Sequence, residues 1–292
     1  MGSILQLEDA YSTPTRVYWD KTTHADKPDA LAMRIGRHFE LLVLELFAEQ
    51  HPELVVTGGG LYVSSFRHWQ AATFDALAYG QTSQPIPVQA KTTYTFDPEH
   101  WGEPPDGDIP GPYHAQMLQE IDVADAPYGW LPVLPTGRRG ALRVYRVERD
   151  ETELDFMREV GEQFHTWLCD GTPPPVDWRP ETTQALKRMY PATVGVDAVV
   201  PKSLGRRARA ARAALRLAER RWGLVENQLR ERMGNATRAV TADDDVIATR
   251  STYDQRHIKA DALRAAHPGI AAEFTAATPV DKILIKQPKV TQ

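Results

Sequence analysis

The sequence lacks the cysteines, the targeting segment and the long apolar runs that define several classes of protein. Cys169 is the only cysteine among 292 residues, which excludes an intramolecular disulfide and a cysteine-based zinc site. The first residues, MGSILQLEDAYS, have no basic start, and no stretch of the chain approaches the length of a membrane span. We therefore expect a cytoplasmic protein without a membrane partner.

The composition is that of a soluble globular protein, with 42% hydrophobic and 25% charged residues. The length allows one large domain or two ordinary ones. The formal net charge of −5 argues against a uniformly basic surface for nucleic acid. Charge is uneven along the chain, however, and local patches decide contact with DNA.

Residues 74–91, FDALAYGQTSQPIPVQAK, are predicted to form two strands joined by a turn. The turn is indicated by Gly80, Ser83, Pro85 and Pro87. Side chains alternate along a strand, so Gln89 and Lys91 should point the same way. The turn could then bring Asp75 back over the same end of the hairpin.

This hairpin offers the ligands of a hard divalent cation. The Asp75 carboxylate, the Gln89 side-chain oxygen and the Ala90 carbonyl would converge at one end, and oxygen ligands of this kind suit magnesium. Lys91 would orient or deprotonate the attacking water. A plain ion pair between Asp75 and Lys91 is the alternative interpretation.

Residues 31–48 are predicted to form a strongly apolar helix that carries Glu40. Glu40 shares a face with Gly36, Val43 and Phe47 at three- and four-residue spacing. An unpaired carboxylate on such a face would be costly to bury, and a cation or Lys91 would remove that cost. The alternative is that Glu40 lies at the edge of the apolar stripe and reaches water.

A second helix is predicted over residues 112–125, with proline in its first turn. Tyr113, Gln116 and either Glu120 or Gln119 could line a groove together. An ordinary amphipathic helix that covers the sheet would show the same spacing. A further helix is predicted over residues 151–168.

Three more turns and hairpins are predicted. LVVT and LYVSSF should form a hairpin that turns at Gly58 to Gly60. YGWLPVLP and ALRVYRVE should form another, with Arg138 and Arg139 at its tip as phosphate contacts or as plain turn residues. NATRAVTADDDVIATRS should turn at Asp243 to Asp245. A short helix and a final strand, VDKILIK, follow.

The C-terminal third contains a long basic helix over residues 205–233, with nine arginines against three glutamates. Its apolar residues form one stripe at helical spacing: Leu215, Ala218, Trp222, Val225 and Leu229. Such a helix can bind phosphates through counterion release. Arginines that are solvated, or paired with acids elsewhere in the chain, are the alternative.

The order of these features resembles a known family. The elements are a G-x-x-x-E helix, an Asp strand, an x-Lys strand and a Y-x-x-Q-x-x-Q helix, carried by Gly36, Glu40, Asp75, Gln89, Lys91, Tyr113, Gln116 and Gln119. Over residues 10–180 this order resembles the YqaJ-like viral recombinases and, more distantly, phage lambda exonuclease. Both belong to the PD-(D/E)XK nuclease superfamily.

The resemblance implies an α/β (α+β) fold with a restriction-endonuclease-like core, a mixed central sheet flanked by helices. Residues 1–180 would form this core. Residues 181–292 would form a helical extension with a β-hairpin, packed on the core.

The resemblance also implies an activity, a Mg²⁺-dependent deoxyribonuclease in which Mn²⁺ can substitute. It would digest duplex DNA ends from 5′ to 3′ in phage-type recombination, and the remaining strand would pass to a single-strand annealing recombinase. In the resembled family a segment before the first helix can contact a DNA phosphate, a role that would fall on Arg16 and Lys21. Solvated surface charges are the more ordinary interpretation of these two residues. A trimer is an expectation by analogy alone.

Gln89 departs from the superfamily motif, which has a carboxylate at this position. Losing one negative charge should weaken cation binding, although an amide oxygen is still a permissible ligand. The departure fits a natural active variant, which we favour, an engineered inactive form or a degenerate DNA-binding module. A catalytically inactive DNA-end-binding protein and a PD-(D/E)XK endonuclease therefore remain as alternative functions.

Overall fold

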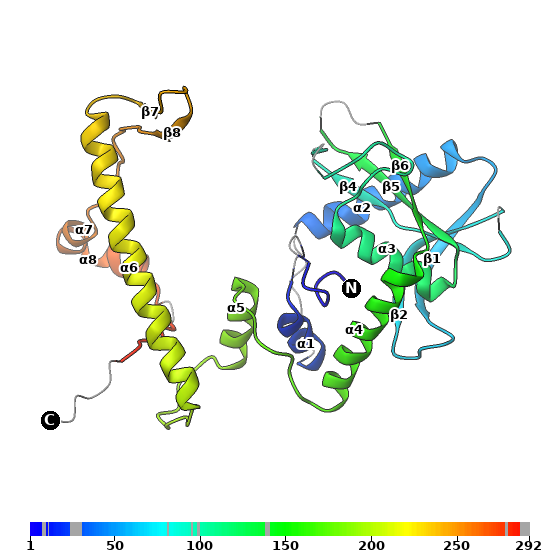
Figure 1. The fold of residues 1–292 in the computed structure, drawn as a ribbon, viewed down its shortest axis with the longest axis horizontal. Coiled ribbons are helices and arrows are strands. Elements are labelled where there is room, and N and C mark those ends of the chain that lie inside the picture. Colours follow the sequence, from blue (N-terminus) through cyan, green and yellow to red (C-terminus); the bar gives the residue numbers. More distant parts are fainter. Residues whose placement is uncertain are drawn as a thin grey trace. The chain divides into compact units, whose positions relative to one another are not determined.

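The computed structural model describes residues 1–7, 10, 12–23, 31–80, 82–94, 96–97, 100–137, 141–277 and 280–286. The chain divides into two compact units, Met1–Pro191 and Ala192–Gln292 (Figure 1). Within the part of the chain that is described, no helix combines the length and the apolar character that crossing a membrane requires.

The first unit is built on a mixed sheet of six strands, which confirms the predicted fold class. The strands are β1 (Val55–Val63), β2 (Ala71–Tyr79), β3 (Ile86–Val88), β4 (Lys91–Thr93), β5 (Tyr128–Pro135) and β6 (Arg143–Glu148). Neighbouring pairs are antiparallel for β1 with β2, β2 with β3, and β5 with β6. Both β3 and β4 pair with β5 in parallel.

Helices cover both faces of this sheet (Figure 1). The helices of the unit are α1 (Pro14–Thr22), α2 (Leu31–Gln50), α3 (Gly111–Ala124), α4 (Glu151–Cys169) and α5 (Pro180–Met189). Phe47 of α2 packs with Trp130 on one face, and Met117 of α3 packs with Leu131 on the other. This alternation along β5 explains its continuous apolar sequence, because a strand covered on both faces buries both sets of side chains.

The predicted helices over residues 31–48, 112–125 and 151–168 are confirmed as α2, α3 and α4. Local sequence sets their starts. Pro112 occupies the first turn of α3, where its missing N–H costs nothing, and the Asp150 side chain accepts a hydrogen bond of 3.0 Å from the Glu153 N–H at the start of α4.

The predicted turn at Gly58 to Gly60 is wrong, because all three glycines lie inside the continuous strand β1. The role of Gly59 is close approach. A Cβ on Gly59 would lie 2.0 Å from the carbonyl oxygen of Phe74, so only glycine lets β1 approach β2 this closely. Gly59 therefore marks tight pairing next to Asp75.

The second unit contains α6 (Lys202–Met233), β7 (Arg238–Val240), β8 (Val246–Thr249), α7 (Ala260–Ala266) and α8 (Pro268–Glu273). Strands β7 and β8 form the predicted antiparallel hairpin, which the Thr241 N–H closes on the Asp245 carbonyl at 2.9 Å. The predicted final strand over residues 280–286 is wrong, because this segment is irregular. Its apolar residues are exposed, and a strand requires a neighbouring strand to pair with.

Candidate active site

Asp75 lies on β2, an interior strand of the sheet, and is fixed by the segment that follows β3. Its Oδ2 accepts hydrogen bonds from the Ala90 backbone N–H, at 2.9 Å, and from the Gln89 side-chain N–H. The structure thus brings Asp75 over the end of the hairpin that carries Gln89 and Lys91, as the turn residues indicate.

The second strand of the hairpin is interrupted between Val88 and Lys91. Val88 pairs with Trp130 and Lys91 with Val133, so the register on β5 continues across the break. The Gln89 N–H still donates to the Trp130 carbonyl at 2.9 Å, whereas the Ala90 N–H turns to Asp75. A carboxylate that captures a backbone donor explains why a continuous strand is not maintained here.

The predicted catalytic and metal-binding residues line one cleft of about 300 Å³. Glu40 reaches it from α2, Asp75 from β2, and Gln89, Ala90 and Lys91 from the second arm of the hairpin. Gly36 also lines the cleft, and a Cβ there would meet no atom within 4 Å. The G-x-x-x-E spacing therefore places Gly36, which has no side chain, one helical turn from Glu40 on the wall of the cleft.

Burial and like charge perturb the ionisation of this cleft. Burial, and after it the nearby Glu40, raise the pKa of Asp75 to about 6 against the opposing effect of Lys91. Burial lowers the pKa of Lys91, while Asp75, Glu120 and Glu40 raise it. Carboxylates that repel each other beside a buried lysine are typical of a functional site that holds a cation or a substrate.

The donor atoms fit a hard divalent cation. Gln89 uses its N–H on Asp75, so its Oε1 is left buried without a hydrogen-bond partner among the described residues. A buried oxygen without a partner is costly, and a cation would satisfy it. Within the described ranges, no group of three or more His, Cys, Asp or Glu side chains is placed to hold a metal. Gln89 lines the cleft with an amide where the superfamily motif has a carboxylate.

Glu120 of α3, which the helical spacing offers as an alternative to Gln119, is not among the predicted catalytic, substrate-binding or metal-binding residues. It is 2% exposed, its Oε1 accepts a hydrogen bond of 2.9 Å from Gln116, and its Oε2 has no partner in the described part of the chain. Burial, with a smaller contribution from Asp75, raises the pKa of Glu120 to about 8 against the opposing effect of the hydrogen bond from Gln116. The spacing with Gln116 placed it on the right face, but spacing alone cannot reveal burial.

Tyr113 and Gln116 lie on the side of α3 that faces this site. The Lys91 Nζ lies 5.6 Å from the centre of the Tyr113 ring, which is within range of a cation–π contact. Gln116 reaches the site through its hydrogen bond to Glu120. The geometry therefore groups both residues with Lys91.

Gln119 is bonded outside the cleft. Its Oε1 accepts from Gln70 and its Nε2 donates to the Ala71 carbonyl, both at 3.3 Å. Gln70 also donates to the buried carboxylate of Asp122. Asp122 forms ion pairs with three arginines: Arg67, Arg149 and Arg158. Burial opposes ionisation of Asp122, but these hydrogen bonds outweigh it and lower its pKa. Gln119 thus belongs to a charged cluster that fixes α3.

Arg16 and Lys21 lie on α1 and do not line the cleft. Arg16 forms an ion pair of 3.2 Å with Asp20, and Lys21 is exposed. Arg138 and Arg139 lie outside the described residues.

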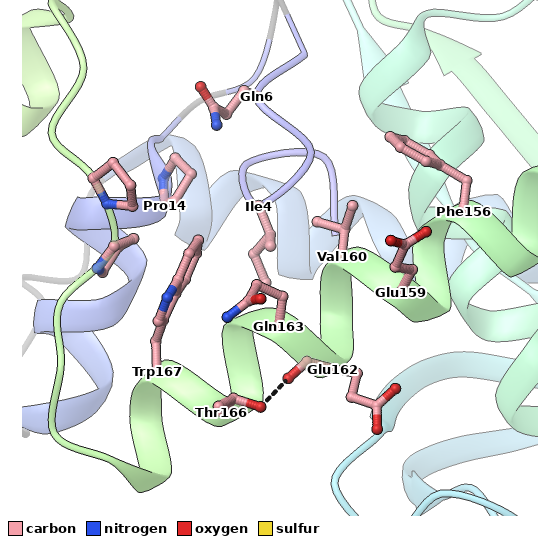
Figure 2. Close-up of a pocket in the computed structure, with 12 residues that line it drawn as sticks. Ile4, Gln6, Pro14, Phe156, Glu159, Val160, Glu162, Gln163, Thr166 and Trp167 are labelled. Atoms are coloured by element: carbon pink, nitrogen blue, oxygen red, sulfur yellow. Dashed lines mark hydrogen bonds between the residues drawn. The ribbon is translucent and has the colours of Figure 1, made fainter.

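A separate cavity of about 590 Å³ lies between the N-terminal segment and α4 (Figure 2). Ile4, Gln6 and Pro14 face Phe156, Val160 and Trp167 across it. It shares no lining residue with the cleft, and it contains no predicted site residue.

The four motifs that line or border the cleft fall within the first 127 residues. Residues 1–127 match the family model of the YqaJ-like viral recombinase domain. The expected resemblance is thereby confirmed over this stretch, which contains Glu40, Asp75, Lys91 and all of α3. A comparison with curated proteins gives no match.

Three solved structures are similar to the chain. The alkaline exonuclease LHK-Exo from Laribacter hongkongensis is 16% identical, with a TM-score of 0.44, over 65% of this chain and 90% of that chain. LHK-Exo in complex with dAMP is 15% identical, with a TM-score of 0.41 and the same two coverages. SSO0001 is 15% identical, with a TM-score of 0.33, over 56% of this chain and 73% of that chain.

Proposed function

We propose that the chain is a metal-dependent deoxyribonuclease whose active site is the cleft between α2, β2 and β4. The observation that supports this most directly is that Glu40, Asp75, Gln89 and Lys91 line a single cleft although they come from different elements. The match of residues 1–127 to the YqaJ-like viral recombinase domain supports the same function.

Asp75, Glu40, the Gln89 Oε1 and the Ala90 carbonyl would hold Mg²⁺, for which Mn²⁺ can substitute. When bound, the ion would supply Lewis-acid stabilisation of the charge that develops on the phosphate. The protein holds Asp75 in place through the Ala90 N–H, so the carboxylate keeps one orientation. Glu40 and Asp75 repel each other, and that repulsion favours binding of a cation between them.

Lys91 would orient the attacking water and stabilise negative charge on the phosphate. It is partly buried beside three carboxylates, Asp75, Glu120 and Glu40, each of which favours its protonated form. Tyr113 covers one side of the ammonium group. Gln116, held by Glu120, would position the substrate strand next to Lys91.

The proposed substrate is a duplex DNA end digested from 5′ to 3′. The remaining 3′ strand would pass to a single-strand annealing recombinase in phage-type recombination, in the cytoplasm of a bacterial host. This part of the proposal follows from the family resemblance, and the geometry of the cleft bears only on the chemistry of cleavage.

A catalytically inactive DNA-end-binding protein is the second candidate. One observation favours it: the Gln89 amide donates to Asp75 and so occupies an oxygen that a cation would need. An active enzyme has to release or share the hydrogen bond between Gln89 and Asp75 when it binds the metal. An inactive DNA-binding module would retain this hydrogen bond and bind no metal.

Cleavage of linear duplex DNA, labelled at either the 5′ or the 3′ end, tests the proposal. Wild type, Asp75→Ala and Lys91→Ala are compared with Mg²⁺, with Mn²⁺ and with chelator, and a covalently closed circle tests for endonuclease action. We expect metal-dependent loss of the 5′ label, abolished in both variants, and an intact circle. DNA binding without cleavage under every condition would contradict the nuclease and support the end-binding protein.

A further inference from the structure

Helix α6 is a long cationic element with little cover from the rest of its unit (Figure 1). It spans 32 residues, and none of them is buried. Leu215 and Trp222, on its apolar stripe, are 48% and 60% exposed. A solitary helix of this kind leaves both of its faces available to a partner.

Five cations form a straight row on one side of α6. At about 100° per residue, their positions fall within an arc of about 80°. The row consists of Lys202, Arg206, Arg209, Arg216 and Arg220. With a rise of about 1.5 Å per residue, it extends over about 27 Å.

The row is not neutralised by neighbouring acids. Within the described part of the chain, Arg230 with Glu226 is the ion pair that involves α6, and neither residue belongs to the row. Glu219 is the sole acid between Lys202 and Arg220, and it lies three residues after Arg216, beside the row. Five cations against this one acid leave the row strongly positive.

We propose that this row binds the phosphate backbone of duplex DNA. Four of the five cations are arginines, whose planar forks bind phosphate in a bidentate manner. Phosphates recur about every 3.4 Å along each strand, so a row of about 27 Å matches about eight base pairs. The proposal concerns the second unit, and it stands whether or not the cleft cleaves DNA.

A membrane surface fits the helix less well. A helix that lies on a bilayer buries its whole apolar face in the interface and keeps its cations on the opposite, polar face. Leu215 and Trp222 lie about 140° to 160° around the helix from the centre of the row and are exposed, but Leu229 and Met233, further along the stripe, are half-buried. The C-terminal part of the stripe, at Leu229 and Met233, faces Ala248 of the β7–β8 hairpin across a cavity of about 330 Å³.

The test measures binding of the full chain to a labelled duplex of about eight to twenty base pairs, by fluorescence anisotropy, in chelator and between 50 and 200 mM salt. The row variant is the triple substitution Arg209→Gln, Arg216→Gln and Arg220→Gln. Glutamine preserves helix propensity, and circular dichroism verifies the helix. We expect the log–log salt slope to fall by about 2.7, since each lost phosphate contact removes about 0.9.

The matched control removes the same charge from another side of the helix, through Arg207→Gln, Arg221→Gln and Arg232→Gln. These positions lie about 100° to 140° from the centre of the row. We expect the control to change the slope by less than about 1. Equal losses in the two triples would overturn the proposal, because net charge alone would then explain binding.

A third triple, in which Arg209, Arg216 and Arg220 become lysine, should keep most of the salt slope of the wild type, since the charge is retained, and should bind more weakly, since lysine lacks the planar fork. A salt slope as low as that of the glutamine triple would overturn a backbone contact of this kind. Vesicles rich in anionic lipid provide the membrane comparison. If the row variant lost vesicle binding but kept its DNA affinity, the row would be a membrane surface. The chelator blocks cleavage in all of these binding measurements. A negative result for the row therefore does not bear on the proposed nuclease activity, and a negative cleavage result does not bear on DNA binding by the row.

Discussion

The Gln89 side-chain N–H donates to Oδ2 of Asp75, and this one contact leaves the Gln89 Oε1 buried without a partner among the described residues. The amide therefore does two things at once. It holds Asp75 in place and keeps an oxygen available at the wall of the cleft. A carboxylate at position 89 would repel Asp75 until a cation was bound.

Gln89→Glu should strengthen metal binding. The substitution adds a negative charge next to Asp75 and Glu40, so the Mg²⁺ concentration for half-maximal cleavage should fall by about tenfold, equivalent to about 1.4 kcal/mol. A Mg²⁺ titration of cleavage measures this, with Gln163→Glu on the exposed face of α4 as the matched control. Maximal activity should be similar to wild type or higher. A change from no activity to strong activity would instead show that glutamine inactivates the site.

Cleavage should depend on the ionisation of Asp75. Its pKa is raised to about 6, so the protonated form dominates below that pH and the ligand is lost. We expect the rate at limiting Mg²⁺ to rise about tenfold per pH unit below about pH 6 and to level off above it. Glu40→Gln should shift the midpoint to lower pH, because Glu40 raises the pKa of Asp75. A midpoint that stays in place would contradict this coupling.

Glu120 should make the protein less stable as pH rises. Its pKa is about 8 in the folded protein against 4.5 as the reference, so between these values unfolding releases a proton. The free energy of unfolding should then fall by up to about 1.4 kcal/mol per pH unit between about pH 5 and 8. Glu120→Gln should remove this contribution. Urea unfolding in chelator at several pH values measures the free energy of unfolding of wild type, Glu120→Gln and, as a control at an exposed position, Glu159→Gln. Parallel pH profiles for these three proteins would refute the prediction.

Gly59→Ala should loosen the strand that carries Asp75. The new methyl group would lie 2.0 Å from the Phe74 carbonyl oxygen, so β1 has to move away from β2. We expect a loss of about 1 to 3 kcal/mol in the free energy of unfolding, as for overpacked cores, together with reduced cleavage. Gly58→Ala is the matched control, because its Cβ meets no atom within 4 Å. Similar losses in both variants would point to general strand propensity.

Much of the site could be predicted because its signals are local. Turn residues between two apolar runs brought Asp75 over Gln89 and Lys91, and helical spacing put Glu40 on the apolar side of α2. These relationships depend on periods of two and 3.6 residues, which the sequence displays directly.

The features that escaped prediction depend on contacts between distant segments. The glycines at 58–60 have the composition of a turn, and only the structure reveals that the backbone of Phe74 occupies the space that a side chain on Gly59 would need. The break at Ala90 arises because Asp75 takes its N–H, and the importance of Glu120 arises from burial. Residues 280–286 have the composition of a strand, but composition cannot supply the neighbouring strand that pairing requires.

Mn²⁺ binding followed by electron paramagnetic resonance tests most directly whether the cleft holds a divalent cation through Asp75. Wild type is compared with Asp75→Asn and with Asp106→Asn, an exposed aspartate as matched control. We expect a saturable Mn²⁺ site in wild type and in the control, displaced by Mg²⁺ and absent from Asp75→Asn. Equal Mn²⁺ binding by all three proteins, or none in wild type, would contradict this expectation.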